Sequence, residues 1–285
     1  MIKPKKSLGQ NFLKDKSILK KIADFAETEK EDFVIEVGPG EGSLTQFLLE
    51  KAKKVIAVEK DEKMVEFLKE KFAKEIKTKK LKIIRGDILN LEFKQNYILV
   101  GNIPYYITGA LFKKFLEAEN QPKSITFVVQ KEVAERIMAK RRLLAGKQGK
   151  ESVLSISIKV YGTPKFGGII KAGSFNPKPK VDSAIISIRD ISRERFEARQ
   201  KSSCSESPRV SSLRSARLSS QDFSVGKEFE QKFFEILRKG FAHKRKLLMK
   251  NLGATKEIFK KCSMPEKARA EDLSVEDWLC LAKTL

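Results

Sequence analysis

A run of glycines between an apolar strand and an amphipathic helix is the feature that most constrains how this chain folds. Residues 33–37 read Phe-Val-Ile-Glu-Val, and residues 38–42 read Gly-Pro-Gly-Glu-Gly. A helical pattern over 43–51 follows directly. Glycines at such a turn let the backbone approach a ligand at the carboxyl edge of a parallel sheet. The motif therefore predicts an α/β fold with a ligand site where this strand ends.

The alternation of strand and helix continues through the first two-thirds of the chain. Further short apolar runs occur at residues 54–59, 81–84, 97–100 and 124–129. Continuous short runs are typical of strands covered on both faces, so we expect a doubly wound, Rossmann-like parallel sheet. Two later runs, 153–160 and 181–188, show no helix between them. We expect these two runs to form an antiparallel hairpin at the edge of the sheet.

The character of the sequence changes after the last of these runs. Residues 192–225 interleave serine with arginine and show no hydrophobic period, which is typical of a low-complexity linker that is disordered or nearly so. Helical patterns follow it to the end of the sequence. We therefore predict a sheet domain over 1–191, a linker over 192–225 and a small helical domain over 226–285.

Composition narrows the chemistry that is available. The chain has one histidine, His243, and three widely spaced cysteines, Cys204, Cys262 and Cys280. We therefore expect no metal site, and reduced thiols of the kind found in cytoplasmic proteins. No apolar run approaches the roughly 18 residues that cross a bilayer, and the first residues lack the apolar stretch of a secretory signal. We expect no membrane partner.

Three carboxylates stand at the carboxyl ends of successive predicted strands. Glu36 precedes the glycine turn, Glu59 ends the next strand, and Asp87 follows the third. Glu36 can pair with an ammonium group, directly or through water, and Glu59 can accept hydrogen bonds from a ribose diol. Asp87 can accept a hydrogen bond from an adenine amine. The alternative is a dinucleotide site, whose G-x-G-x-x-G fingerprint would require a third glycine where Ser43 stands. An acid at position 36 would also repel a phosphate. The pattern therefore favours S-adenosylmethionine over NAD.

Residues 101–106, Gly-Asn-Ile-Pro-Tyr-Tyr, follow the fourth predicted strand. The exocyclic amine of adenine is a poor nucleophile because its lone pair is delocalised into the ring. The side-chain oxygen of Asn102 and the carbonyl of Ile103 can accept from this amine and aim its lone pair, and Pro104 keeps Ile103 extended. Tyr105 offers a ring for the base to stack on, worth about 1–3 kcal/mol. The segment predicts methylation of an adenine amine, with a simple Asn-x-Pro turn as the alternative.

Several motifs, taken in order, resemble those of the KsgA-type ribosomal RNA adenine dimethyltransferases. They lie at residues 7–13, 36–42, 59, 86–87, 102–105, 175–184 and 241–252. The resemblance implies an S-adenosylmethionine-dependent enzyme that makes N6,N6-dimethyladenine in small-subunit ribosomal RNA during ribosome assembly, as a cytoplasmic monomer. The residues it implies for the cofactor are Asn11, Leu13, Gly38, Gly40, Glu59, Asp87 and Asn102. It also implies that Phe175 closes on a flipped adenine opposite Tyr105.

The charge of the chain agrees with a nucleic-acid partner. The formal net charge is +22, and a polyanion is a common reason for so large an excess of basic residues. Basic residues cluster at 3–21, 140–150 and 238–250. We expect these clusters to contact RNA phosphates, with solvated surface as the alternative.

Two other functions fit parts of the sequence. One is that of the related large-subunit dimethylases that confer macrolide resistance, and the long basic C-terminal segment favours the KsgA type over it. The other is a non-catalytic RNA- or DNA-binding factor built on this fold, against which the intact 102–105 motif argues. The chain departs from the family's usual pattern in the long 192–225 stretch and at 146–153, where a Tyr-Gly-Arg-Leu-Ser pattern is usual.

Overall fold

The computed structural model describes residues 9–139, 149–197, 220–243 and 246–285. Within these residues seven strands form one sheet, in the order β4-β3-β2-β5-β6-β9-β7. The strands are β2 (Phe33–Val37), β3 (Lys54–Glu59), β4 (Leu81–Arg85), β5 (Ile98–Asn102), β6 (Ser124–Gln130), β7 (Thr163–Ile170) and β9 (Ser183–Arg189). The strands β2 to β6 run parallel to one another, whereas β9 is antiparallel to both of its neighbours, β6 and β7. The predicted Rossmann-like sheet is confirmed.

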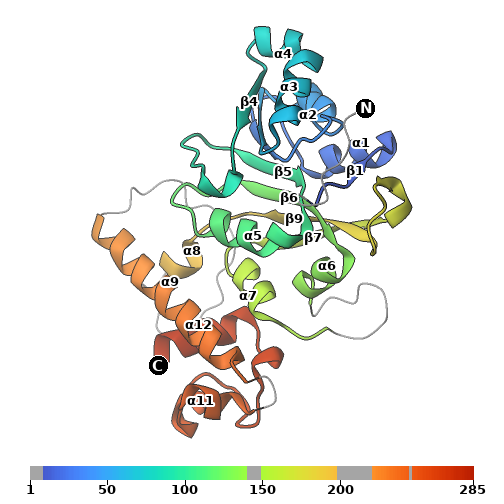
Figure 1. Ribbon diagram of the computed structural model, residues 1–285. Coiled ribbons are helices and arrows are strands. Elements are labelled where there is room, and N and C mark those ends of the chain that lie inside the picture. The colour runs from blue at the N-terminus through green and yellow to red at the C-terminus, as the bar shows by residue number, and fades with distance from the viewer. Residues whose placement is uncertain (1–8, 140–148, 198–219, 244–245) are drawn as a thin grey trace.

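Helices cover both faces of this sheet (Figure 1). Successive residues of a strand point to opposite faces, so Val34 of β2 lies in one apolar core and Ile35 in the other. The first core also holds residues of α1 (Lys16–Phe25), α2 (Thr45–Lys51) and α3 (Glu62–Lys71), which α4 (Ala73–Lys77) follows. The second core also holds residues of α5 (Thr108–Leu116), α6 (Lys131–Ile137) and α7 (Val153–Lys159). Both faces of β2 are therefore apolar, as its sequence indicated.

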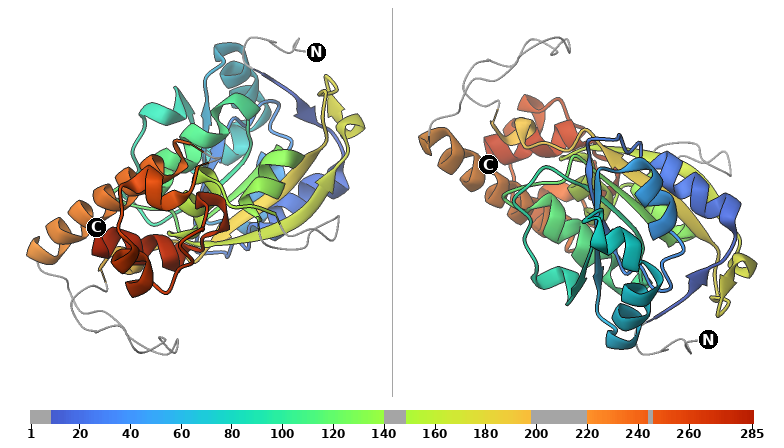
Figure 2. Two further views of the ribbon diagram at one scale, coloured as in Figure 1. Left: turned by 90° about the horizontal axis from the view of Figure 1, so that it is seen from below. Right: turned by 90° about the horizontal axis from the view of Figure 1, so that it is seen from above.

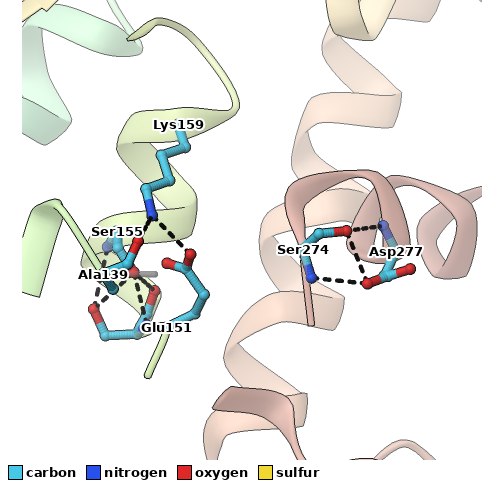
Figure 3. Close-up of polar contacts among 7 residues, drawn as sticks. Ala139, Glu151, Ser155, Lys159, Ser274 and Asp277 are labelled. Carbon is cyan, nitrogen blue, oxygen red and sulfur yellow. Dashed lines mark hydrogen bonds and ion pairs between the residues drawn. The ribbon is translucent and has the colours of Figure 1, made fainter. Parts of the chain in front are cut away.

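The C-terminal helices gather at the end of the molecule opposite α3 and α4 (Figures 1 and 2). They are α8 (Glu194–Glu197), α9 (Ser220–Phe241), α10 (Leu248–Leu252), α11 (Lys256–Lys261), the short turn η6 (Ala270–Asp272) and α12 (Val275–Thr284). A capping box of Ser274 and Asp277 begins α12 (Figure 3), and Trp278 in its first turns is fully buried. These helices share one continuous apolar core with the α5–α7 face of the sheet.

The prediction of a strand over 153–160 was wrong. The segment is the helix α7, whose N-cap Ser152 accepts from the Ser155 amide while the Ser155 hydroxyl accepts from the Ser152 amide. A short apolar run does not by itself distinguish a buried strand from a buried helix, and this capping box decides for the helix. The edge strand is β7 instead, which pairs with β9 and has a register shift between Phe166 and Gly168.

The predicted linker is ordered at both of its described ends. Phe196 in α8 is 1% exposed, and its ring lies 5.5 Å from those of Tyr161 and Phe233 and 5.9 Å from that of Phe229. At the other end, α9 already begins at Ser220. The expectation of disorder for residues 192–197 was therefore wrong, because this aromatic side chain completes the core between the two domains. Residues 198–219 lie outside the described residues.

The expectation of reduced thiols was wrong for two of the three cysteines. Cys262 and Cys280 form a disulfide, with their Cα atoms 5.8 Å apart. They lie 18 positions apart in sequence, so the spacing gave no sign that α11 and α12 pack together. Cys204 lies outside the described residues.

A separate two-stranded sheet covers the carboxyl edge of the large one. Its strands are β1 (Phe12–Leu13) and β8 (Phe175–Asn176), paired antiparallel with Leu13 opposite Phe175. Short turns complete this edge, namely η2 (Ile88–Asn90), η3 (Tyr105–Ile107) and η4 (Ala172–Ser174). No helix among the described residues is both long and apolar enough to span a membrane.

Candidate cofactor and adenine site

A cavity of about 260 Å³ opens at the carboxyl edge of the sheet, between the ends of β2, β3, β4 and β5. The glycine turn forms one wall, with Gly38 and Gly40 at φ of 63° and 55°. These left-handed angles suit glycine far better than other residues. A Cβ atom on Gly40 would also lie 2.7 Å from the ring of Phe12 in β1. The turn therefore needs glycine both for its conformation and for the close approach of β1.

Glu36 lines this cavity from the end of β2 and is almost fully buried. Its Oε2 accepts a hydrogen bond from Thr45 Oγ1 at 2.7 Å. Burial raises the pKa of the carboxyl to about 8, although the bond from Thr45 acts in the opposite direction. The sequence pointed to Glu36 but not to Thr45, because a threonine in the first turn of a helix is common.

Glu59 ends β3 and lines the same cavity. Its Oε1 accepts from the amide of Asp61 at 2.9 Å and its Oε2 from the amide of Gly40 at 3.2 Å. Burial raises its pKa, and these backbone bonds oppose the rise. The carboxylate is thus fixed between the glycine turn and the start of α3, and each oxygen retains a lone pair for a ligand hydroxyl.

Asp87, the third predicted acid, also lines the cavity. Its Oδ1 accepts from the amide of Leu89 at 3.0 Å, and its Oδ2 accepts from Lys60 Nζ at 2.9 Å. The bond from Lys60 is the main reason why the pKa of Asp87 lies below its usual value. Lys60 was missed at the sequence level, since it directly follows Glu59 in a chain with many lysines.

The N-terminal segment and the 102–105 motif meet at the same cavity. Asn102 ends β5, and its Nδ2 donates to the carbonyl of Asn11 at 3.0 Å. This bond fixes the amide plane and leaves Oδ1 as the acceptor of the side chain. Leu13 is buried against the cavity from β1. The structure therefore brings Asn11 and Leu13 together with Asn102, which lies about ninety residues later in the sequence.

Tyr105 lines the cavity beside Asn102, and a hydrogen bond of 2.6 Å between its hydroxyl and Ser183 Oγ holds its ring. Burial raises the pKa of the phenol, so the ring is neutral at physiological pH. The next residue, Tyr106, is 66% exposed at the edge of the same cavity. Ser183 in β9 had no sequence signal, because its role depends on how β9 pairs beside β6.

Phe175 does not line the cavity. Its side chain is 4% exposed and packs in the apolar core that includes Leu13 and Leu19. The arrangement in which Phe175 faces an adenine opposite Tyr105 is therefore not the one in this structure. Here the ring of Phe175 supports β1 through its pairing partner Leu13.

The predicted basic clusters are described only in part. Residues 3–6, 140–148 and 244–245 lie outside the described residues. In the first cluster Lys14 and the lysines of α1 are exposed, and in the third Arg238, Lys246 and Lys250 are exposed. Lys150 of the second cluster instead forms an ion pair with Glu271.

The profile of the family described as "Ribosomal RNA adenine dimethylase" matches residues 1–203. The chain belongs to this family. Its relatives include two proteins named "Ribosomal RNA small subunit methyltransferase A". The one from Dehalococcoides mccartyi strain CBDB1 is 35% identical over 98% of this chain and 88% of its own. The one from Clostridium acetobutylicum is 34% identical over 96% of this chain and 90% of its own.

Two solved structures resemble this adenine dimethylase throughout its length. The 23S rRNA methyltransferase ErmE is 25% identical, with a TM-score of 0.67 over 96% of this chain and 99% of its own. A dimethyladenosine transferase from Plasmodium falciparum has a TM-score of 0.70 over 95% of both chains. The two sequences are 24% identical, so this likeness is evidence for the fold alone. Both domains of the chain thus have counterparts in solved structures.

The carboxylate of Glu59 gives a test of the cofactor of this dimethylase. We expect Glu59→Ala to weaken S-adenosylmethionine binding by about 1.5–3 kcal/mol, because a charge-assisted contact to the ribose is lost. Calorimetry on wild type, Glu59→Ala and the exposed control Glu62→Ala measures the effect, and only Glu59→Ala should weaken binding. A wild-type preference for NAD over S-adenosylmethionine would contradict the assignment of the cavity.

The buried Glu36 should make the stability of the dimethylase depend on pH. Its pKa rises from 4.5 to about 8 in the folded chain, so the folded state holds a proton that the unfolded state releases. This stabilisation is complete below pH 4.5 and is lost as pH rises toward 8, at up to about 1.4 kcal/mol per pH unit. Urea unfolding between pH 5.5 and 8 should show a smaller decline for Glu36→Gln than for wild type.

The exposed Glu50 of α2 provides the control for this pH dependence. Glu50→Gln should decline with pH as steeply as wild type. Equal slopes for Glu36→Gln and wild type would show that the Glu36 carboxyl is not protonated in the folded protein.

Proposed function

We propose that this chain transfers methyl groups from S-adenosylmethionine to the N6 amine of adenines in small-subunit ribosomal RNA, and that N6,N6-dimethyladenine is the product. The observation that carries the proposal is the place of Asn102. Its Nδ2 is bonded to the Asn11 carbonyl, so its Oδ1 is the acceptor in a cavity shared with three carboxylates. The names of the family and of the relatives agree with this reading. We further propose that the enzyme acts as a cytoplasmic monomer.

The polar groups that line the cavity fit S-adenosylmethionine. Glu36 can pair with its ammonium group, Glu59 with the ribose hydroxyls, and Asp87 with the adenine amine. Gly38 and Gly40 let the backbone approach the ligand. When bound, S-adenosylmethionine supplies a methyl group on a positively charged sulfur. Pyrophosphate would instead meet the carboxylate of Glu59, which would repel it.

The role proposed for Asn102 and Ile103 is to hold the target amine. Two acceptors, Asn102 Oδ1 and the Ile103 carbonyl, take the two N–H groups and turn the nitrogen lone pair away from the ring. The amine then becomes more nucleophilic without a general base. After transfer the N6 nitrogen carries a positive charge. It loses its proton readily, because the neutral N6 amine is conjugated with the ring and is therefore a weak base. The cavity therefore has no need of the single histidine of the chain.

The role proposed for Tyr105 is to hold the base itself. Its hydroxyl bond to Ser183 fixes the ring plane before RNA arrives, which lowers the entropy lost on stacking. Phe175 is assigned a supporting role behind β1. The exposed cations of α1 and the C-terminal helices are assigned to RNA phosphates.

Transfer of tritium from labelled S-adenosylmethionine tests the substrate. Small subunits, large subunits and the naked RNA of each should be compared, all purified from cells without the enzyme. We expect label in small subunits and little in large ones. Labelling of large-subunit RNA alone would favour the other activity considered, which is the one named for ErmE.

A further inference from the structure

A second cavity, of about 570 Å³, lies between the sheet domain and the C-terminal helices. Its lining comes from α5, α6 and α7 on one side and from α9 and η6 on the other. Backbone and side-chain contacts hold these two sides together, since the Glu151 amide donates to the Glu271 carbonyl at 2.9 Å and Lys150 pairs with Glu271. The volume falls within the range of about 300–1,000 Å³ that is common for ligand sites.

The two cavities are neighbours along one short segment of chain. Ile107, at the end of η3, lines the first cavity, and Gly109, in the first turn of α5, lines the second. Gly109 is exposed, and a Cβ atom there would meet nothing within 4 Å. A strand that places one base beside Tyr105 would therefore cross open surface to reach the second cavity.

The second cavity has an excess of positive charge. Lys113, Arg136 and Arg238 line it and are exposed, and none of them forms an ion pair with another residue of the described chain. Of the acids in the lining, two are already neutralised. Glu151 is paired with Lys159 at 2.7 Å (Figure 3), and Glu271 is paired with Lys150.

The third acid, Glu117, lies near two of these cations. Burial raises its pKa, and the charges of Lys113 and Arg238 lower it. The three cations without an ion pair outnumber the single carboxyl of Glu117, so the net charge of the lining favours the binding of an anion. Cations of this kind are the usual ligands of phosphate.

Aromatic side chains form another part of the lining of this cavity. Tyr161, Phe234 and Phe241 line the cavity. The rings of Tyr161 and Phe234 are stacked at 6.0 Å, and Phe241 stacks on Trp278 at 5.5 Å. Rings held in this way can receive a planar base at little entropic cost.

We propose that this cavity is a second nucleotide site, which binds one nucleoside monophosphate unit, with its phosphate at Lys113, Arg136 and Arg238 and its base against the aromatic wall. The unit comes from a free nucleotide or from an RNA strand whose target adenine occupies the first cavity. The RNA source rests on the proposed function. The free-nucleotide source does not depend on it.

Binding of adenosine 5′-monophosphate tests the site directly. Calorimetry is carried out with saturating S-adenosylhomocysteine, which fills the cofactor cavity. The variants are Arg136→Gln with Arg238→Gln, a control of Lys63→Gln with Lys74→Gln on exposed positions of α3 and α4, and Tyr105→Ala. We expect the first double variant to weaken binding at least tenfold, and the control and Tyr105→Ala to bind as wild type does. Melting temperatures verify that every variant is folded.

Steady-state methylation of small subunits distinguishes the two sources. If RNA supplies the nucleotide, the Arg136/Arg238 double variant should raise KM severalfold more than the Lys63/Lys74 control, with kcat little changed. If a free nucleotide is the ligand, the monophosphate binds and KM of the two variants agrees. The inference is overturned if the monophosphate binding is absent or insensitive to Arg136 and Arg238 and KM is also the same in both double variants. Failure of methylation in the wild type would sink the proposed function and leave the calorimetric test standing.

Discussion

Replacement of Asn102 by alanine should reduce methyl transfer by about 10²- to 10³-fold, the usual cost of removing one fixed polar contact to the reacting group. The loss follows because the amine would keep one acceptor, the Ile103 carbonyl, and its lone pair would return to the ring. Single-turnover transfer from labelled S-adenosylmethionine to small subunits measures the rate of the chemical step. The melting temperature should change little, because the side chain of Asn102 makes a single hydrogen bond within the described residues, to the carbonyl of Asn11.

Asn90 provides the matched control, since it is exposed on η2 and does not line the cavity. Asn90→Ala should transfer methyl groups at the wild-type rate. Tyr105→Ala should bind cofactor normally but require more RNA for the same rate. Near wild-type transfer by Asn102→Ala would show that the catalytic assignment is wrong.

The second large effect is expected at Arg193, where the two domains join. Its Nε donates to Glu230 at 3.2 Å, while its NH1 and NH2 groups donate to the carbonyls of Ala118 and Glu117 at 2.8 Å each. Arg193 and Glu230 are each 10% exposed, and Glu230 also accepts from the hydroxyl of Tyr161. Arg193→Ala leaves a buried carboxylate without its cation, which costs about 3–5 kcal/mol. Urea unfolding measures this loss of stability.

Arg195, two residues further on, is the control. It pairs with Glu276, but the two side chains are 46% and 70% exposed, and exposed pairs contribute about 0–1 kcal/mol. Arg195→Ala should therefore lower the free energy of unfolding by no more than about 1 kcal/mol. Equal losses for the two variants would mean that Arg193 does not hold the helical domain on the sheet domain.

The arrangement of Glu36, Glu59 and Asp87 around one cavity was predictable from sequence. Parallel strands present their carboxyl ends at the same edge of a sheet, so an acid at the end of each of three such strands must converge. The 102–105 motif reaches the same cavity for the same reason, because it follows β5, which is the parallel neighbour of β2.

The contacts that refine the site depend on packing between distant segments, which no local pattern records. Ser183 reaches Tyr105 because β9 inserts between β6 and β7. Phe196 is buried because α9 returns to α8 across residues outside the described chain. The run at 153–160 has β-branched residues in a helix, and only its capping box at Ser152 and Ser155 distinguishes it from a strand.

Arg193 connects stability to function in this account. It ties α9 to the end of α5, the helix that follows the target-amine motif and lines the second cavity. We therefore expect Arg193→Ala to affect RNA methylation more than cofactor binding, because the side chain of Arg193 bonds to no residue that lines the cofactor cavity.

Nucleoside analysis of the reaction product tests whether the chain dimethylates adenine in small-subunit RNA. Small subunits from cells that lack the enzyme are incubated with S-adenosylmethionine and wild-type protein, and their RNA is digested to nucleosides for mass spectrometry. We expect N6,N6-dimethyladenosine in the wild-type reaction and its near absence with Asn102→Ala. A methylated nucleoside other than adenosine, or no methylated nucleoside while S-adenosylmethionine binds, would contradict this expectation.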